Sequence, residues 1–428
     1  MKQKKKYNIG FISTRLAGMD GVSLETRKWA AVFEQAGVSC FYMAGELDHP
    51  MDRSFLVAEA HFNHPKIQQI QQACFGVQTR KPEVTRQIHA MKDYLKKQIY
   101  AFIAKYEIDL LIPENALAIP MNLPLGLAIT EVISESGLHS IAHHHDMFWE
   151  RKRFLVNAAW EYLNMAFPPH LPSIWHVVIN SSAKNQLSLR TGISSELIPN
   201  IMDFENPPPP PDDYAVNIRR DLEFEDDEYF ILQPTRVVQR KGIEHAIELV
   251  SHLGLKAKLV ISHATCDEGF GYEKRVRDYA KSLNVKTLFI CDLIQDERGT
   301  TPDGRKIYSL ADVYPHADLV TYPSSFEGFG NAFLEAIYYR RPLVVNNYSI
   351  YATDIKPKGF KVIEFDGYIT EKTIATTRKV LTNPEVSEEM VEHNYQLAKR
   401  HYSYAVLRRK LRGLIFDILG DIGITHEM

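Results

Sequence analysis

Short apolar runs alternate with longer amphipathic segments along the first half of the chain. Near its start, Asn8–Ser13 predicts a buried strand, an apolar stripe over Val22–Ala36 predicts a helix that ends at Gly37, and Ser39–Met43 predicts a second strand. The same alternation continues with predicted strands at Ile108–Ile112, Ser140–Ala142 and His176–Asn180 and predicted helices at Leu123–Ser136 and Ser181–Arg190. This order is typical of a parallel sheet covered by helices, and it predicts a Rossmann-like domain.

The second half repeats the pattern. Strands are expected at Tyr229–Gln233, Lys258–Ser262, Thr287–Cys291, Leu319–Tyr322 and Pro342–Asn346, and helices at Tyr272–Leu283, Ile307–His316, Glu371–Leu381 and Ser387–Arg400. Between the halves, Pro207–Pro211 forms a proline run that is extended and poorly suited to either core.

These boundaries predict an α/β chain of two doubly wound domains. The first covers 1–204 and carries a mostly helical insertion over about 49–106, and the second covers 205–400. The remaining segment, 401–428, predicts a terminal helix with an apolar stripe opposite basic residues.

Composition describes an ordinary globular protein. The chain has 428 residues, of which 45% are hydrophobic and 24% charged, with a net charge of −3, so we expect no dedicated binding of nucleic acid. Its four cysteines show no C-x-x-C spacing, which favours the reduced cytoplasm over a disulfide framework. The apolar run after MKQKKK is too short for a signal peptide or a membrane span, so we expect no integral membrane segment. The oligomeric state stays open.

The stretch EGFGNAFLE, which follows the predicted strand Leu319–Tyr322, carries the strongest chemical signal. Glu327 and Glu335 stand eight positions apart, and Gly328 and Gly330 flank Phe329 where a backbone can approach a ligand closely. A helix begins at Asn331, and its free N–H groups suit a phosphate or sugar hydroxyls. Two separated carboxylates can accept hydrogen bonds from two ends of one hydroxyl-rich ligand.

This stretch resembles the E-x7-E signature of retaining glycosyltransferases with the GT-B fold, close to glycosyltransferase family 4. The resemblance implies two Rossmann-like domains facing a central cleft, with the terminal helix crossing back to the first domain. It implies that Glu327 faces the donor sugar and that Glu335 binds the ribose of the nucleotide. Backbone groups of Gly328, Phe329, Gly330 and Asn331 would help to fix the donor.

A second element of the resemblance lies at Arg236 and Lys241, where PTRVVQRKG matches the R-x4-K element of that family. The family's arrangement implies that these cations bind the donor diphosphate and offset the charge that grows on the leaving group. The resemblance therefore implies no metal and no other cofactor, with a nucleotide diphosphate sugar as co-substrate. Gly21, in the loop GMDGVSLE, is similar to the glycine loop that lies against donor or acceptor in many GT-B enzymes.

The histidine run His143, His144 and His145 stands where a predicted strand ends, the edge at which parallel sheets place ligand groups. Alternation along a strand allows His143 and His145 to share a face that His144 does not. A metal site, a structural role and an active-site role are all open, and metal is the least favoured because no second His/Cys cluster accompanies the run. The resemblance favours His145 near the donor sugar, and Asp146 and Arg151 are candidates for contacts with the acceptor.

The function implied is transfer of a hexose, glucose or mannose, from a nucleotide diphosphate sugar to an acceptor hydroxyl, with retention. A small acceptor such as a sugar phosphate or a glycerate-like acid is favoured, and a lipid or glycan acceptor is open. A sugar-nucleotide isomerase or phosphorylase on the same fold and a non-catalytic sugar-nucleotide sensor are the alternatives.

Overall fold

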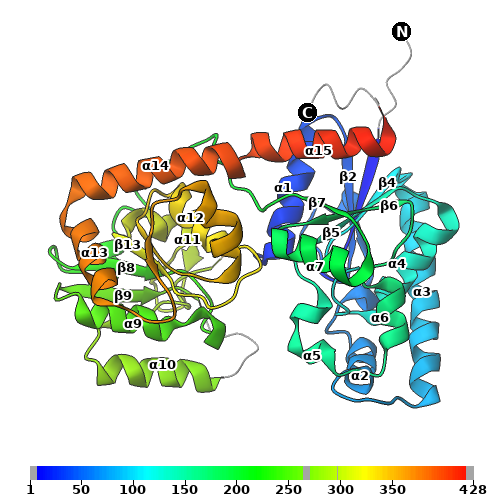
Figure 1. Ribbon diagram of the computed structural model, residues 1–428, viewed down its shortest axis with the longest axis horizontal. Coiled ribbons are helices and arrows are strands. Elements are labelled where there is room, and N and C mark those ends of the chain that lie inside the picture. The colour runs from blue at the N-terminus through cyan, green and yellow to red at the C-terminus, as the bar shows by residue number, and fades with distance from the viewer. Residues whose placement is uncertain (1–6, 264–269, 296, 421–428) are drawn as a thin grey trace, which may run out of the picture. The chain divides into compact units, whose positions relative to one another are not determined.

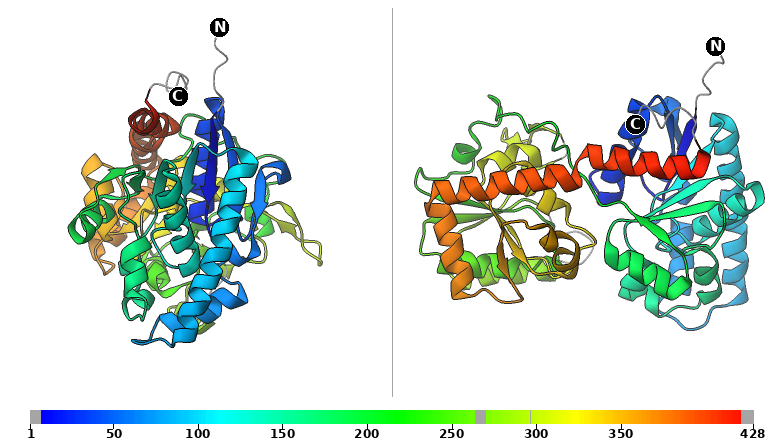
Figure 2. Two further views of the ribbon diagram at one scale, coloured as in Figure 1. Left: turned by 90° about the vertical axis from the view of Figure 1, so that its right-hand side faces the viewer. Right: turned by 45° about the horizontal axis from the view of Figure 1, so that its top comes forward.

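The computed structural model describes residues 7–263, 270–295 and 297–420 (Figure 1). Contacts between residues divide the chain into two units. The first unit combines Met1–Asn200 with Ala405–Met428, and the second comprises Ile201–Tyr404. Each unit is built around one parallel sheet, and Figure 2 shows helices on both faces of each sheet. The prediction of two Rossmann-like domains is therefore confirmed.

The first unit contains a seven-stranded sheet with the strand order β3-β2-β1-β4-β5-β6-β7, and all neighbours are parallel. Its strands are β1 (Asn8–Ile12), β2 (Ser39–Ala44), β3 (Ser54–Leu56), β4 (Leu110–Pro113), β5 (Ser140–His144), β6 (Ile174–Val178) and β7 (Ser195–Leu197). Its helices are α1 (Gly21–Gln35), α2 (Pro65–Cys74), α3 (Pro82–Tyr106), α4 (Leu123–Ser136), α5 (Lys152–Leu155), α6 (Trp160–Ala166), α7 (Ser181–Thr191) and α15 (Tyr404–Leu419).

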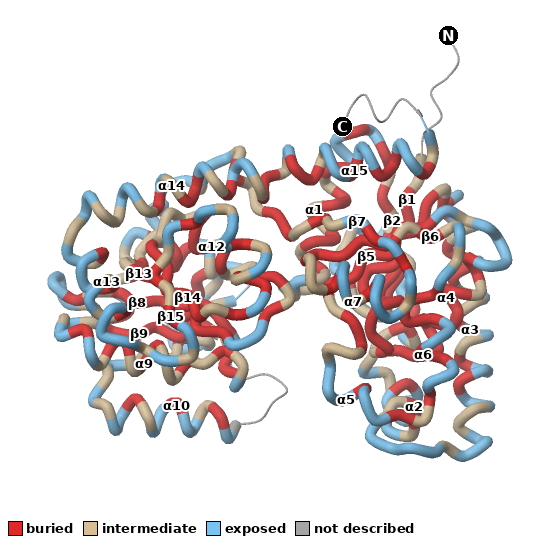
Figure 3. Tube along the Cα trace, viewed as in Figure 1, coloured by how far each residue is buried: buried red, intermediate tan, exposed pale blue. Residues whose placement is uncertain are grey.

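The segment 49–106 is mostly helical, as the sequence indicates, because α2 and α3 form most of it. Three residues of it, Ser54–Leu56, differ from the expectation and form the edge strand β3, which pairs with β2. The apolar stripe of α3 lies buried in the same core as α4 (Figure 3). The segment is therefore part of the first unit's core.

The second unit contains a six-stranded parallel sheet with the order β10-β9-β8-β13-β14-β15. Its strands are β8 (Tyr229–Gln233), β9 (Ala257–Ile261), β10 (Thr287–Phe289), β13 (Leu319–Tyr322), β14 (Leu343–Asn346) and β15 (Ile363–Phe365), with a separate hairpin of β11 (Gly299–Thr300) and β12 (Lys306–Ile307). Its helices are α8 (Ile218–Asp221), α9 (Ile243–His252), α10 (Phe270–Ser282), α11 (Leu310–Val313), α12 (Asn331–Tyr338), α13 (Glu371–Thr382) and α14 (Pro384–Tyr402).

One helix expected in this unit is wrong at its start. Ile307 belongs to the hairpin strand β12, and the helix α11 begins after Ser309. Ser309 and Asp312 form a capping box, in which the Ser309 backbone N–H donates to the Asp312 carboxylate at 2.8 Å. This box fixes the helix start. Among the described residues, no helix combines the length and the apolar character needed to cross a bilayer.

Candidate functional site

The loops after β8 and β13 bring two of the expected site segments together in the second unit. These strands are direct neighbours in the sheet, with Ile231 opposite Leu319. Because they are parallel, their carboxyl ends meet at one edge, where α/β sheets bind ligands. The loop after β8 carries Arg236 and Lys241, and the loop after β13 carries Glu327.

Glu327 and Lys241 form a buried ion pair at this edge. Lys241 Nζ donates to Glu327 Oε1, and Arg240 Nη1 donates to Glu327 Oε2 at 3.3 Å. Both Glu327 and Lys241 are 8% exposed. Burial alone would raise the pKa of Glu327, but the charges of Lys241 and Arg240 outweigh burial and hold that pKa below its usual value. Glu327 is therefore an ionised carboxylate with two cations beside it.

Arg236 differs from Lys241 in its surroundings. Its side chain is exposed, and its guanidinium makes no hydrogen bond or ion pair within the described part of the chain. The charge of Arg236 still acts on the site. After burial, it is one of the causes that lower the pKa of Lys241. After burial, it also helps to lower the pKa of His263 to about 4. The two expected phosphate ligands thus comprise one engaged lysine and one arginine open to an anion.

Two glycines shape the backbone around this pair. Gly330 has a φ of +120°, and a Cβ there would come within 2.6 Å of the Tyr348 hydroxyl oxygen. Gly242 has a φ of +57°, and a Cβ there would come within 2.6 Å of the Pro323 carbonyl oxygen. Both positions therefore require glycine, for conformation and for space.

The side chain of Phe329 is buried. Its ring is 3% exposed and packs edge-on against Tyr402, with 5.4 Å between ring centroids. Its carbonyl oxygen accepts a hydrogen bond from the Tyr348 hydroxyl at 2.9 Å. Phe329 therefore anchors the glycine turn, and α12 begins directly after it at Asn331.

Glu335 lies on α12, one side of which is buried, and is held by a tyrosine that the sequence did not single out. The Tyr314 hydroxyl donates to Glu335 Oε2 at 2.8 Å. Tyr314 is 1% exposed and stacks on Tyr339, with 4.9 Å between ring centroids. Burial and then the charge of Glu335 raise the pKa of the tyrosine well above its usual value, so it stays a hydrogen-bond donor.

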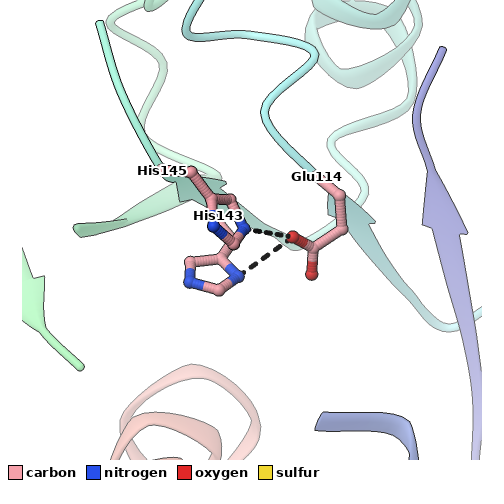
Figure 4. Close-up of side chains that lie close together, drawn as sticks. All are labelled: Glu114, His143 and His145. Carbon is pink, nitrogen blue, oxygen red and sulfur yellow. Dashed lines mark hydrogen bonds and ion pairs between the residues drawn. The ribbon is translucent and has the colours of Figure 1, made fainter. Parts of the chain in front are cut away.

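In the first unit, the predicted division of the histidine run is confirmed. His143 Nδ1 lies 3.0 Å and His145 Nε2 lies 3.2 Å from Glu114 Oε2 (Figure 4). His144 Nε2 lies instead 2.9 Å from His176 Nδ1. Strand β5 ends at His144, so alternation along the strand turns the middle histidine to the other face.

Glu114 and Asn115, directly after β4, are the residues here that sequence reasoning missed. Glu114 is fully buried, and Asn115 has a φ of +57°. The Asn115 side chain accepts from the His145 backbone N–H at 3.0 Å and donates to Asp146 Oδ1 at 2.8 Å. The available signal was their place after a strand that neighbours β5.

Charge in this histidine cluster follows from burial and from Glu114. Burial would raise the pKa of Glu114, but the two histidines outweigh it and hold that pKa low. Burial lowers the pKa of His143, whereas the contact of His145 with Glu114 outweighs burial and raises the pKa of His145.

The remaining candidate residues, Asp146, Arg151 and Gly21, also belong to the first unit. Arg151 is half exposed and pairs with Asp146, which couples both candidate acceptor ligands to the cluster through Asn115. Gly21 is the first residue of α1 and is exposed. Asp20 caps that helix, because its Oδ1 accepts from the backbone N–H groups of Val22 and Ser23 at 3.0 and 3.2 Å.

Comparison with solved structures identifies the fold. Sucrose-phosphate synthase from Thermosynechococcus elongatus superposes with a TM-score of 0.67 at 14% identity, covering 96% of this chain and 100% of that one. HepE of Anabaena, solved with UDP-glucose, gives 0.63 at 12% identity, covering 96% and 99%. The shared fold is GT-B.

The family follows from sequence. The model of "Glycosyl transferases group 1" matches residues 216–397, which lie in the second unit. Mannosylglucosylglycerate synthase of Thermotoga maritima is 30% identical over 92% of this chain and 96% of its own length, and that of Petrotoga mobilis is 30% identical over 83% and 86%. The chain belongs to the glycosyl transferases group 1 family.

Proposed function

We propose that this protein is a retaining, family 4 type hexosyltransferase that moves mannose from a nucleotide diphosphate sugar to a small hydroxy acid carrying a glucosyl group. The ion pair of Lys241 with Glu327, the nearby charge of Arg236, and Glu335 on the following helix α12 support a nucleotide diphosphate donor. Similarity to two mannosylglucosylglycerate synthases over most of the chain supports mannose as the sugar and a glucosylglycerate-like acceptor. This acceptor is one of the small acids that the sequence favours.

The donor half of the mechanism uses the second unit. The guanidinium of Arg236 offers several N–H donors to the diphosphate. Lys241, which pairs with Glu327, adds a compact positive charge that would contact the ligand as well as the carboxylate. Both cations stabilise the negative charge that develops as the sugar–phosphate bond breaks. We propose that they replace a divalent ion in this role, so that the transfer step needs no metal cofactor.

Glu327 positions the sugar and does not attack it. Its two carboxylate oxygens already contact Lys241 and Arg240, so it is placed to accept hydrogen bonds from sugar hydroxyls beside those cations. Glu335, oriented by Tyr314, would accept the hydroxyls of the ribose. The acceptor hydroxyl would then enter on the face that the leaving diphosphate vacates, which preserves the anomeric configuration.

The first unit would supply the acceptor side, with His145 near the sugar and Asp146 and Arg151 near the acid.

The described cysteines Cys40, Cys74 and Cys291 are free thiols, which favours the reducing cytoplasm as the place of action.

Calorimetry with UDP, GDP, ADP and their glucose and mannose conjugates tests the donor site. We expect one nucleotide diphosphate to bind and Glu335→Gln to weaken it about tenfold or more, because the amide still accepts from Tyr314 but binds a diol less strongly. Glu389→Gln is the matched control, since Glu389 is an exposed helical carboxylate that pairs with Lys361 at 2.6 Å.

Product analysis with the donor that binds and with glucosylglycerate, glycerate or 3-phosphoglycerate then tests the reaction. Release of the free nucleotide together with a glycosylated acid is the expected outcome. Conversion of donor without acceptor would instead identify an isomerase, and binding without any turnover would identify a sensor. No binding by any nucleotide would refute the proposed donor site.

A further inference from the structure

Three buried side chains that could bind a metal ion lie close together at the end of β5. Glu114 is fully buried, His143 is 1% exposed and His145 is 9% exposed. One donor atom from each lies within 4.8 Å of the other two, and both histidines contact the same carboxylate oxygen, Glu114 Oε2 (Figure 4). The histidines come from β5 and the residue after it, and the carboxylate follows the neighbouring strand β4.

The hydrogen bonding of this cluster is incomplete within the described part of the chain. Glu114 Oε1 and both ring nitrogens of His143 are buried and have no hydrogen-bond partner there. The 3.0 Å contact between His143 Nδ1 and Glu114 Oε2 has the length of a hydrogen bond but not its direction. Buried polar atoms without partners are costly, and a bound metal ion would give these atoms a partner.

We propose that Glu114, His143 and His145 bind a divalent first-row transition metal ion, for which Zn²⁺ is the probe. Two imidazoles and one carboxylate are a ligand set that Zn²⁺ and Fe²⁺ accept, whereas Mg²⁺ prefers oxygen ligands. Metal–ligand bonds of about 2.0–2.2 Å in tetrahedral geometry place neighbouring donor atoms about 3.3–3.6 Å apart. The two contacts of Glu114 Oε2, at 3.0 and 3.2 Å, are shorter than that spacing, so a small outward shift of the side chains would admit the ion.

The surrounding residues hold the ligands in this arrangement before any ion arrives. The Trp29 ring stacks on His143, with 4.3 Å between centroids and 22° between planes. Asn115 binds the backbone N–H of His145 at 3.0 Å. Such preorganisation lowers the cost of ordering the ligands on binding. His145, as the most exposed of the three, leaves one side of the ion open to a further ligand.

The ion has a consequence for transfer, and this part alone rests on the proposed function. It engages His145, which we place near the donor sugar, so Zn²⁺ is an inhibitor rather than a cofactor of the transferase. The site lies in the first unit, whereas the proposed diphosphate ligands lie in the second. Metal binding and donor binding are therefore measured independently.

The test is titration of the full-length, chelator-treated protein with Zn²⁺ by calorimetry and with Co²⁺ by visible absorption. We expect one ion per chain, a Co²⁺ spectrum of low coordination number and no binding of Mg²⁺ at the same concentration. His143→Ala and Glu114→Gln should each weaken Zn²⁺ binding at least tenfold. His144→Ala is the matched control, because it removes an adjacent buried histidine that faces His176.

Each other outcome overturns the proposal. No stoichiometric binding would show that protons or water alone complete the cluster. Equal loss of binding in His144→Ala and His143→Ala would show that His143 is not a specific ligand of the ion. If a variant does not fold, the Co²⁺ spectrum of the wild type decides, because a spectrum equal to that of aqueous Co²⁺ would show that no side chain of the protein binds the ion. Nucleotide binding measured in chelator tests the donor site separately, so a failure of one proposal does not imply failure of the other. Zn²⁺ should also inhibit transfer by the wild type more than transfer by His143→Ala.

Discussion

At the scale of single residues, the turn that precedes α12 depends on a glycine. Gly330 joins the buried Phe329 to the first residue of α12, and its φ of +120° lies in a region that side chains rarely adopt. The Tyr348 hydroxyl occupies the space a Cβ would need while it holds the Phe329 carbonyl. One added methyl group therefore disturbs both the backbone angle and this hydrogen bond.

Gly330→Ala should destabilise the second unit by about 1–3 kcal/mol, the usual cost of a strained backbone angle. For a unit of this size each kcal/mol lowers the melting temperature by about 2–4 °C. Gly413→Ala is the control, because Gly413 lies on α15 with no heavy atom within 4 Å of a Cβ, so it should be neutral or stabilising by up to about 1 kcal/mol. Thermal unfolding of both variants measures the difference, and equal melting temperatures would contradict it.

At the scale of elements, the sequence predicted those with clear start and stop residues. The helix Leu123–Ser136 matches residue for residue, since Asn122 caps its start and Gly137 adopts a left-handed conformation at its end. The edge strand β3 was missed because three residues carry no readable alternation. The Ile307–His316 helix was placed too early because apolar spacing continues from β12 into α11.

At the candidate site, the sequence likewise predicted residues in contiguous motifs and missed the partners that lie elsewhere in the chain. Motif spacing identified Glu327, Glu335 and the histidine run, because each sits in a contiguous pattern. Tyr314 and Glu114 escaped notice because their partners, Glu335 and His145, lie far along the chain, so pairing becomes visible once the sheets align their strands. Whether Gly21 and Arg151 meet a substrate stays a prediction.

The two cations of the loop after β8 should have different effects: Arg236 should contribute to ligand binding, whereas Lys241 should also contribute to stability. Arg236→Ala should weaken nucleotide diphosphate binding about tenfold or more, the loss of charge-assisted hydrogen bonds worth about 1.5–3 kcal/mol. Its effect on stability should stay within about 0.5 kcal/mol, because the side chain is exposed. Lys241→Met should cost about 3 kcal/mol of unfolding free energy, because among the described residues it leaves the buried Glu327 with Arg240 as its one ion-pair partner. Calorimetry and urea unfolding separate these effects, and a destabilised Arg236→Ala with normal affinity would be inconsistent with this division.

At the scale of the whole molecule, the residues proposed for the donor and those proposed for the acceptor belong to different units. The family model covers 216–397, inside the second unit, whereas the histidine cluster lies in the first. The mannosylglucosylglycerate synthase of Thermotoga maritima matches over 92% of the chain and therefore over both units. The features that define the family thus concern the second unit, and the acceptor should be chosen mainly by the first.

His145→Asn should separate these two roles. Nucleotide diphosphate affinity should stay within about twofold of wild type, because the proposed ligands of the nucleotide diphosphate all belong to the second unit and this ligand lacks the sugar that His145 is proposed to face. Turnover should fall about 100-fold, the cost of misplacing reacting groups. Glu335→Gln should show the reverse pattern, with the larger change in affinity. Calorimetry and a nucleotide-release assay, both in chelator so that no metal occupies the histidine cluster, measure the two quantities. If His145→Asn instead weakens nucleotide binding as strongly as Glu335→Gln does, the histidine contributes to the donor site, and the division of roles between the units is wrong.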